Sequence, residues 1–111
     1  MRRIILYLCL FLLLAGCEIN IGGEAFFYQI EEIEVELKKD NWKEVVVKAY
    51  ELKELYKKNK WKIQLLGDED EYESLYESIN KLITASQEKD QISSRMELTT
   101  IYTHIEDIYS L

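Results

Sequence analysis

The chain has 111 residues, no proline, four glycines, two cysteines and a formal net charge of −7. So few turn-forming residues disfavour an all-β fold, and the acidic charge argues against a nucleic-acid partner. Two cysteines cannot build a disulfide framework, so the fold must depend on one small hydrophobic core.

Residues 1–16 have the pattern of a lipoprotein signal peptide. Arg2 and Arg3 form a positive start, and a short apolar run follows over residues 4–14. That run is shorter than the ~20 apolar residues of a stable bilayer-spanning helix. We expect the segment to be a cleaved leader, with an uncleaved signal anchor as the alternative.

A lipobox closes the leader. Leu14, Ala15 and Gly16 precede Cys17, which supplies small residues for a signal peptidase and a thiol for lipid transfer. We expect a diacylated Cys17, because two acyl chains give the stable anchoring that one chain does not. The predicted location is the extracytoplasmic face of the bacterial cell membrane.

The sequence predicts a lipidated cysteine and tether over residues 17–24, and a helical domain over 25–111. Fully extended, residues 18–23 span about 20 Å, which keeps the domain close to the lipid headgroups. Cleavage of the leader removes two arginines, so the number of basic residues falls from 14 to 12. With 21 acidic residues, the net charge of the remaining chain is −9. Such a domain should be repelled by an anionic surface, so the anchor must hold it there.

Two helices are predicted in the first half of the domain. One covers about residues 25–39, and the next begins at Trp42 after a cap at Asp40 or Asn41. Their apolar positions recur at helical spacing, at Phe26, Ile30, Ile33 and Leu37 and then at Val45, Ala49, Leu52 and Tyr56. The second helix either continues to residue 66 or breaks near residues 58–60.

Two further helices are predicted in the second half. Gly67 is expected to end the preceding helix in a left-handed conformation, and Asp68 and Glu71 form a capping box for the third helix. Asp90 is the expected cap of the fourth. The predicted apolar faces comprise Tyr72, Leu75, Tyr76, Ile79, Leu82 and Ile83, and then Ile92, Met96, Thr99, Tyr102, Ile105 and Tyr109, widened by Leu98, Ile101 and Ile108.

Short connections place successive helices side by side in opposite directions. The predicted fold is therefore all-α, a small antiparallel up-down bundle of about four helices after the cleaved leader.

A basic patch with an aromatic residue is the first candidate surface. Lys57, Lys58 and Lys60 surround Trp61 in the sequence. They could meet an acidic partner, an anionic polymer or lipid headgroups. The simpler interpretation, which we favour, is a solvated helix end whose lysines offset the helix dipole.

His104 is the only histidine, and it could contact a ligand together with Tyr72, Tyr76 and Tyr102. Zinc usually needs three or four protein ligands, so we expect neither a metal site nor a cofactor. The favoured interpretation is a histidine at the edge of the core, hydrogen-bonded to a neighbouring acid.

The acidic run over residues 68–71 lacks the spacing of a calcium loop. It fits the start of a helix, where carboxylates are favoured by the helix dipole. No positioned base and nucleophile are visible, so we expect no catalytic residues and no enzyme.

The lipobox, the stretch Asp40-Asn41-Trp42-Lys43-Glu44, Lys60-Trp61 and Thr103-His104-Ile105-Glu106 resemble a family of small bacterial lipoproteins, domain of unknown function 4363. The resemblance covers roughly residues 1–107. It implies an all-helical, membrane-attached protein with no assigned activity. Family members often carry a histidine before the third helix, which this chain lacks, so a shared two-histidine metal site is disfavoured.

The predicted function is therefore that of a lipid-anchored, non-enzymatic interaction module of the cell envelope. Its partners would be the membrane, through the anchor, and another envelope protein. A ligand- or metal-binding lipoprotein with a site between helices is the alternative.

Overall fold

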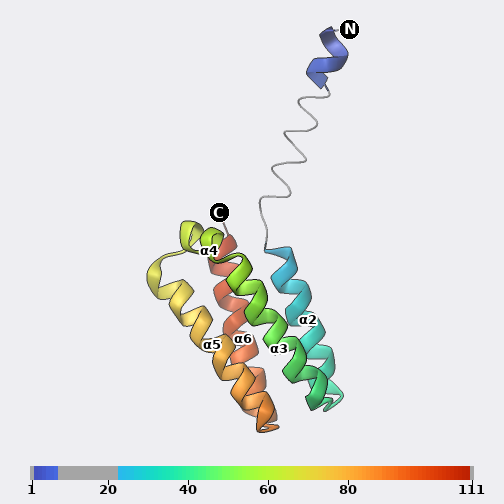
Figure 1. Cartoon of the computed structure of the whole chain (residues 1–111), viewed down its shortest axis with the longest axis vertical. Helices are drawn as coiled ribbons and strands as arrows, with labels where there is room; N and C mark the ends of the chain where they lie inside the picture. Colours follow the sequence, from blue (N-terminus) through green and yellow to red (C-terminus); the bar gives the residue numbers. More distant parts are fainter. Residues whose placement is uncertain (1, 8–22, 111) are drawn as a thin grey trace.

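The computed structural model describes residues 2–7 and 23–110, and every regular element in them is a helix (Figure 1). Residues 2–7 are helical. The domain contains α2 (Glu24–Lys38), α3 (Trp42–Lys58), α4 (Lys60–Leu66), α5 (Glu69–Gln87) and α6 (Gln91–Tyr109). The prediction of an all-α fold is confirmed.

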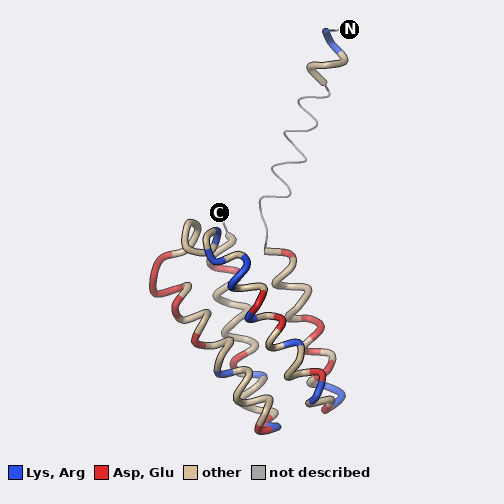
Figure 2. The backbone as a smooth tube through the Cα atoms, in the orientation of Figure 1, with Lys and Arg blue, Asp and Glu red and all other residues tan. Residues whose placement is uncertain are grey.

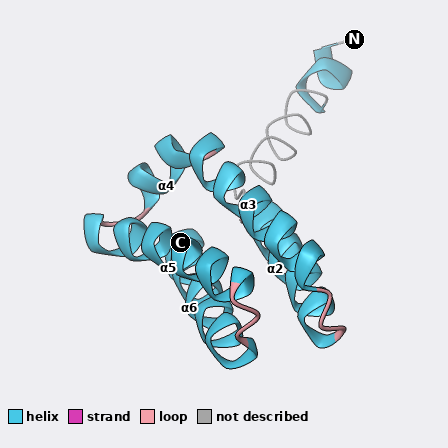
Figure 3. Cartoon of the chain, turned by 60° about the horizontal axis from the view of Figure 1, so that its bottom comes forward, coloured by secondary structure: helices cyan, strands magenta, loops and turns pink. Residues whose placement is uncertain are grey.

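The four long helices pack as a ring. Helix α2 contacts α3, α3 contacts α5, α5 contacts α6, and α6 returns to contact α2. The pair formed by α5 and α6 is the most extensive. The α2–α3 and α5–α6 loops lie at one end of the ring, and α4 lies at the other (Figures 1 and 3). The two loops therefore define a loop end, and α4 marks the opposite end.

The core follows the apolar stripes predicted for the first three long helices. Each stripe faces the ring interior, because one apolar face per helix is enough to pack against two neighbours. The fully buried side chains on these helices include Phe26, Ile33, Val45, Ala49, Leu52, Leu75, Ile79 and Leu82.

Helix α6 differs from its prediction. Its buried apolar positions are Leu98, Ile101, Ile105, Ile108 and Tyr109. The expected leading positions Ile92, Met96 and Tyr102 are 71%, 65% and 44% exposed, and Thr99 is also exposed. The buried positions and the exposed positions form two apolar stripes on different sides of α6. Only α5 and α2 cover this helix, apart from a small contact with α4. The assignment of Ile92, Met96, Thr99 and Tyr102 to the core was therefore wrong.

The open question about the second predicted helix is resolved by a break at Asn59. Helix α3 ends at Lys58, and α4 begins at Lys60. The Asn59 side-chain Nδ2 donates a 2.9 Å hydrogen bond to the Leu55 carbonyl. Asparagine competes for backbone hydrogen bonds in this way and so favours helix ends. Helix α4 then leaves the line of α3 (Figure 3).

Gly67 ends α4, but without the expected left-handed conformation. Its φ is −108° and its ψ is 163°, which is extended backbone. A Cβ at this position would lie 3.0 Å from Cγ1 of Ile108. Glycine is therefore suited to this position by the close approach of α6, and the predicted reason was wrong.

Left-handed residues occur instead in the two loops at the loop end. Asp40 and Lys89 have φ values of 54° and 56°. In each loop the next residue's N–H reaches back five positions, from Asn41 to the Glu36 carbonyl and from Asp90 to the Ala85 carbonyl. This is the hydrogen bond of a Schellman motif, which satisfies carbonyls at a helix end.

The predicted caps are confirmed on two helices. Asp68 accepts a 2.9 Å hydrogen bond from the Glu71 N–H, and Asp90 accepts a 3.0 Å bond from the Ser93 N–H. Asn41 precedes α3 but makes no side-chain cap bond. The two bonded caps fix the starting points of α5 and α6.

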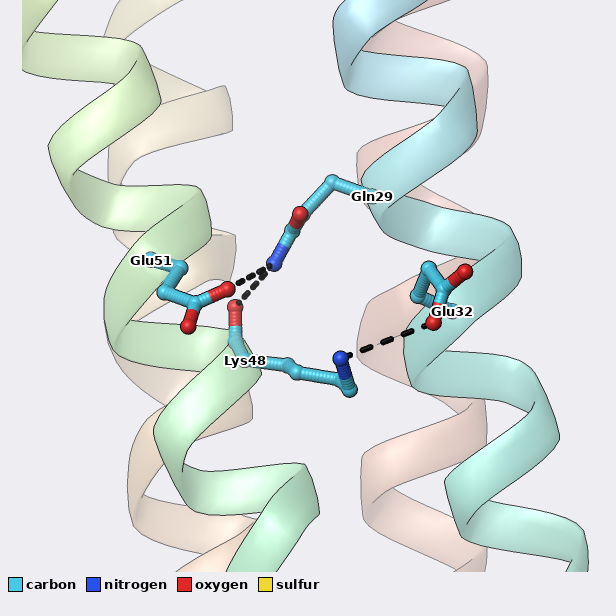
Figure 4. Close-up of polar contacts among 4 residues, drawn as sticks. All are labelled: Gln29, Glu32, Lys48 and Glu51. Carbon is cyan, nitrogen blue, oxygen red and sulfur yellow. Dashed lines mark hydrogen bonds and ion pairs between the residues drawn. The ribbon is translucent and has the colours of Figure 1, made fainter.

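Polar side chains join α2 to α3 on their outer side (Figure 4). Gln29 Nε2 donates hydrogen bonds of 3.0 Å to the Lys48 carbonyl and 3.1 Å to Glu51 Oε2. The Lys48 ammonium lies 3.5 Å from Glu32 Oε2. These contacts set the register of the α2–α3 pair.

Candidate functional site

The predicted lipidation site, Cys17, and the lipobox residues Leu14, Ala15 and Gly16 lie outside the described residues. Among the residues that the structure describes, no helix has the length and apolar character needed to cross a membrane.

The predicted basic patch lies at the end opposite the loops, around the junction of α3 and α4 (Figure 2). Lys57, Lys58 and Lys60 are exposed there. Lys57 lies 3.7 Å from Glu54, an exposed pair that contributes little to stability. The patch is thus an exposed cationic corner, which is compatible both with a solvated helix end and with a surface that meets an anionic partner.

Trp61 is 63% exposed, and Leu65, one helical turn further on, is 77% exposed. The two side chains therefore share the outward side of α4. Ile63, on the opposite side, is fully buried. We call Trp61 and Leu65 the α4 face. Trp61 is not a core residue; it lies on an exposed surface beside the lysines.

Two close approaches place the C-terminal end of α4 and the start of the described domain at the same end of α6. A Cβ added to Gly67, at the end of α4, would lie 3.0 Å from Ile108. A Cβ added to Gly23 would lie 3.1 Å from Cγ of Tyr109. Ile108 and Tyr109 are neighbours in the last turn of α6, so both segments meet the same helix end (Figure 1).

Three tyrosines gather beside the basic corner. The Tyr56 hydroxyl donates a 3.3 Å hydrogen bond to the Tyr72 carbonyl, and the rings of Tyr56 and Tyr76 are 5.1 Å apart. Burial, more than its neighbours, raises the pKa of the Tyr56 hydroxyl. A shallow hollow of about 430 Å³ is lined by these residues together with Lys57, Lys60, Gln64 and Glu73.

Tyr102 does not join that group. Its ring packs against Phe27 at 5.1 Å, between α6 and α2. Tyr72 and Tyr76 line the hollow beside the basic corner, whereas Tyr102 lines a different one, so these three members of the proposed ligand site with His104 are divided between two hollows.

His104 is partly buried on α6. Its Nδ1 atom is buried and has no hydrogen-bond partner within residues 2–7 and 23–110. This nitrogen therefore does not form the expected hydrogen bond between the histidine and a neighbouring acid. The same residues contain no group of three or more His, Cys, Asp or Glu side chains placed to share a metal ion.

The acidic run at the start of α5 serves as a helix start. Asp68 caps the Glu71 N–H, and Glu69 and Asp70 occupy the first turn. Partial burial raises the pKa of the Glu71 carboxyl, and the adjacent Asp68 raises it further. The Asp68 cap fits the interpretation of the run as a helix start, whereas the raised pKa of Glu71 reflects its burial and the nearby Asp68 carboxylate.

A groove between α2 and α6, toward the loop end, was missed by the sequence analysis. The groove has a volume of about 510 Å³, and its lining is more apolar than that of the hollow beside the tyrosines. We call it the α2–α6 groove. It is lined by Ile30, Glu34, Leu37, Lys38, Asp40, Gln91, Arg95, Leu98, Thr99 and Tyr102.

Both ends of the groove are closed by contacts between its two helices. At one end, Gln91 Nε2 donates hydrogen bonds of 2.9 Å to the Leu37 carbonyl and 2.8 Å to Asp40 Oδ1. At the other end, Tyr102 packs against Phe27. The eleven-residue step from Gln91 to Tyr102 corresponds to about 16 Å of helix.

The rim of the groove carries charge. Lys38 pairs with Glu34 at 3.7 Å, whereas Arg95 is exposed and forms no ion pair among the described residues. Ile92 and Met96 extend the apolar surface outward along α6. Helix α6 carries two apolar stripes, and its neighbouring helices can cover only one of them. The second stripe is the sequence signal that could have revealed this surface.

The comparisons give no relative from which a role could be transferred. No protein-family model, curated protein or solved structure matches the chain. The resemblance to the lipoprotein family therefore stays a prediction.

Proposed function

We propose that the protein is a lipid-anchored, non-enzymatic interaction module on the extracytoplasmic face of a bacterial cell membrane. In this proposal, residues 1–16 are a cleaved leader and Cys17 carries the lipid. The folded part acts as a small up-down bundle, and it presents the α2–α6 groove to another envelope protein.

The observation that carries the proposal is the apolar surface of the α2–α6 groove and its extension. Ile92 and Met96 are mostly exposed, and they adjoin a groove lined by buried Leu98 and Leu37. Exposed apolar patches next to a groove are typical of protein interaction sites. The tether would begin at Gly23, at the other end of α2, so the groove would face away from the anchor.

The groove fits an amphipathic helix of the partner. Its length of about 16 Å matches three turns, and helices bind grooves through apolar residues three or four positions apart. Arg95 on the rim has no carboxylate partner among the described residues, so the partner helix should carry an acidic residue at that point.

A small apolar ligand is the second candidate occupant. A volume of about 510 Å³ lies within the range of small-molecule pockets, and the groove floor is made by Ile30, Leu37 and Leu98. This would be the ligand-binding form of the alternative function, at the same surface.

Photo-crosslinking in intact cells tests the proposal. A photoreactive residue at Met96 should capture one reproducible envelope protein, and Arg95→Glu should reduce the capture at least tenfold. Val47, 44% exposed on the outer side of α3, gives a matched control position that should capture nothing reproducible.

Equal capture from Met96 and Val47 would contradict the groove as the partner site. Loss of capture in Trp61→Ala, with Arg95→Glu unaffected, would move the partner to the basic corner instead. Mass spectrometry of the same membranes should show a diacylated Cys17, and an uncleaved chain would overturn the anchor. A ligand screen by thermal shift tests the second candidate, since saturation at 100 times Kd adds about 2.7 kcal/mol.

A further inference from the structure

We infer that the α4 face, Trp61 and Leu65, rests in the headgroup region of the membrane that holds the lipid anchor. The inference depends on the anchored state proposed above, and it assigns a membrane-contact role to a helix that no part of that proposal uses.

The first step is the construction of α4. Ile63 is fully buried and holds the helix against the bundle, while Trp61 and Leu65 are 63% and 77% exposed. A short helix with one docked side and one apolar outward side presents a convex surface. Tryptophan is well suited to a membrane interface, because its ring is apolar and its indole N–H is polar.

The second step is the length of chain between the anchor and the domain. Five residues lie between Cys17 and Gly23, so the two Cα atoms are six steps apart, at most about 20 Å. Gly23 contacts Tyr109 and Gly67 contacts Ile108, so α4 and the start of the domain meet the same turn of α6. A lipid on Cys17 therefore keeps this end of the bundle, and not the loop end, near the bilayer.

The third step is the charge around the α4 face. Lys62 lies over the Trp61 ring at 5.4 Å, and Lys58 and Lys60 are exposed on the same corner. Lysines beside an apolar surface can extend their ammonium groups to lipid phosphates while their stems stay in the apolar layer.

Carboxylates oppose the lysines nearby. Glu69, Asp70 and Glu73 are exposed at the start of α5, at the same end of the bundle (Figure 2). The lysines therefore orient the bundle, with its α4 corner toward the headgroups and the start of α5 away from them. The apolar side chains supply the attraction, so the domain is not simply repelled by the surface as the net charge of −9 expected after loss of the leader suggests.

The two tryptophans provide a test with an internal control. Trp61 lies at the α4 end, and Trp42 begins α3 at the loop end, about 25 Å away along that helix. The lipidated protein is purified from membranes and reconstituted into vesicles of phosphatidylglycerol and phosphatidylethanolamine. A fraction of the lipid carries bromine near the headgroup end of its acyl chains, which quenches nearby tryptophan fluorescence.

Trp42→Phe leaves Trp61 as the reporter, and Trp61→Phe leaves Trp42. We expect the tryptophan fluorescence of Trp42→Phe to be quenched at least threefold more than that of Trp61→Phe. Adding Leu65→Asp to Trp42→Phe should remove most of this difference. Val47 is 44% exposed on α3, outside both proposed surfaces, so Val47→Asp is the matched control and should leave the difference unchanged. Circular dichroism verifies that each variant is folded.

Equal quenching of the two reporters, in protein that floats with the vesicles and carries a diacylated Cys17, would overturn the inference and leave the anchor intact. A chain whose Cys17 carries no lipid would overturn the proposed anchor, and the inference with it. The mass of the purified protein separates these two failures.

Discussion

The two ends of the bundle expose similar side chains in different shapes. At the α4 end, Trp61 and Leu65 stand on a convex helix above buried Ile63. At the loop end, Ile92 and Met96 flank a groove closed by two hydrogen bonds from Gln91. A convex apolar face suits a fluid surface such as a lipid layer, whereas a groove suits a shaped occupant. The shape of each apolar surface, more than its residue composition, therefore distinguishes the proposed membrane contact from the proposed protein partner.

The two ends also differ in how they are held. The α4 face depends on a seven-residue helix that is held by buried Ile63 and by partly buried Leu66. The groove depends on contacts between residues more than fifty positions apart in the chain, such as Gln91 and Leu37. Substitutions should therefore act locally at the α4 end and through helix pairing at the groove.

The largest effect should come from Ile63→Ala. Removing a fully buried aliphatic side chain leaves a cavity and should lower the free energy of unfolding by about 2–5 kcal/mol. Leu65→Ala, two positions away but 77% exposed, should change it by less than about 0.5 kcal/mol. Urea denaturation followed by circular dichroism measures both. Similar losses from the two variants would show that α4 is not docked through Ile63.

Gln91→Ala should have the next largest effect. It removes two hydrogen bonds between α6 and the end of α2, which should cost about 1–2 kcal/mol. Gln87→Ala is the control, because its side chain makes one exposed bond, to the Tyr50 hydroxyl. Hydrogen exchange should speed up at the end of α2 in the first variant only. Unchanged exchange there would mean that the groove is held by packing alone.

Asp90→Ala tests the cap at the loop end, through pH. Hydrogen bonds from the Ser93 N–H and hydroxyl hold the pKa of the Asp90 carboxyl below its usual value. A lowered pKa in the folded state stabilises the protein at every pH above the unfolded value. That stabilisation is lost as the pH falls through the folded pKa.

The difference in melting temperature between the original chain and Asp90→Ala should therefore be greatest near neutral pH. It should shrink in acid, below pH ~4, where the unfolded carboxyl begins to take up its proton. Thermal melts at several pH values measure it. A difference that grows in acid would contradict the assigned role of the carboxylate.

The smallest effect should be a gain from Lys89→Gly. Lys89 adopts a left-handed conformation, which costs a residue with a Cβ roughly 1 kcal/mol. Glycine avoids this cost, but its more flexible unfolded state offsets part of the gain. Asp40→Gly removes the same strain but also loses the bond from Gln91, so it should gain less or nothing. Equal gains, measured by urea denaturation, would show that this bond adds no stability.

Much of the fold was predictable, because α2, α3 and α5 each carry one apolar stripe. Phe26, Val45 and Leu75 recur with their neighbours at a single helical spacing, and one such pattern leaves one choice of buried side. Helix α6 carries two stripes. Local periodicity cannot decide between Met96 and Leu98, because the choice depends on where α5 and α2 lie.

The sites were less predictable for the same reason. The lysines and Trp61 were visible as a pattern, but the position of α4 at the same end of the bundle as Gly23 depends on the last turn of α6. Gly67 shows what local sequence patterns cannot predict. Its place at a helix end was predicted, yet a close approach by Ile108, a residue 41 positions later, explains it and was not visible in the local sequence.

The ring of helices has a consequence for how the chain folds. The pairs α2–α3 and α5–α6 each close over a short loop, so forming them costs little chain entropy. The contact between α2 and α6 joins the first and last helices of the domain and needs the longest closure. We expect this contact to form after the two local pairs, because closing the longer segment costs more chain entropy. The α2–α6 groove thus lies along the seam where the ring closes, and a chain caught before closure would expose Ile30 and Leu98 together with Met96.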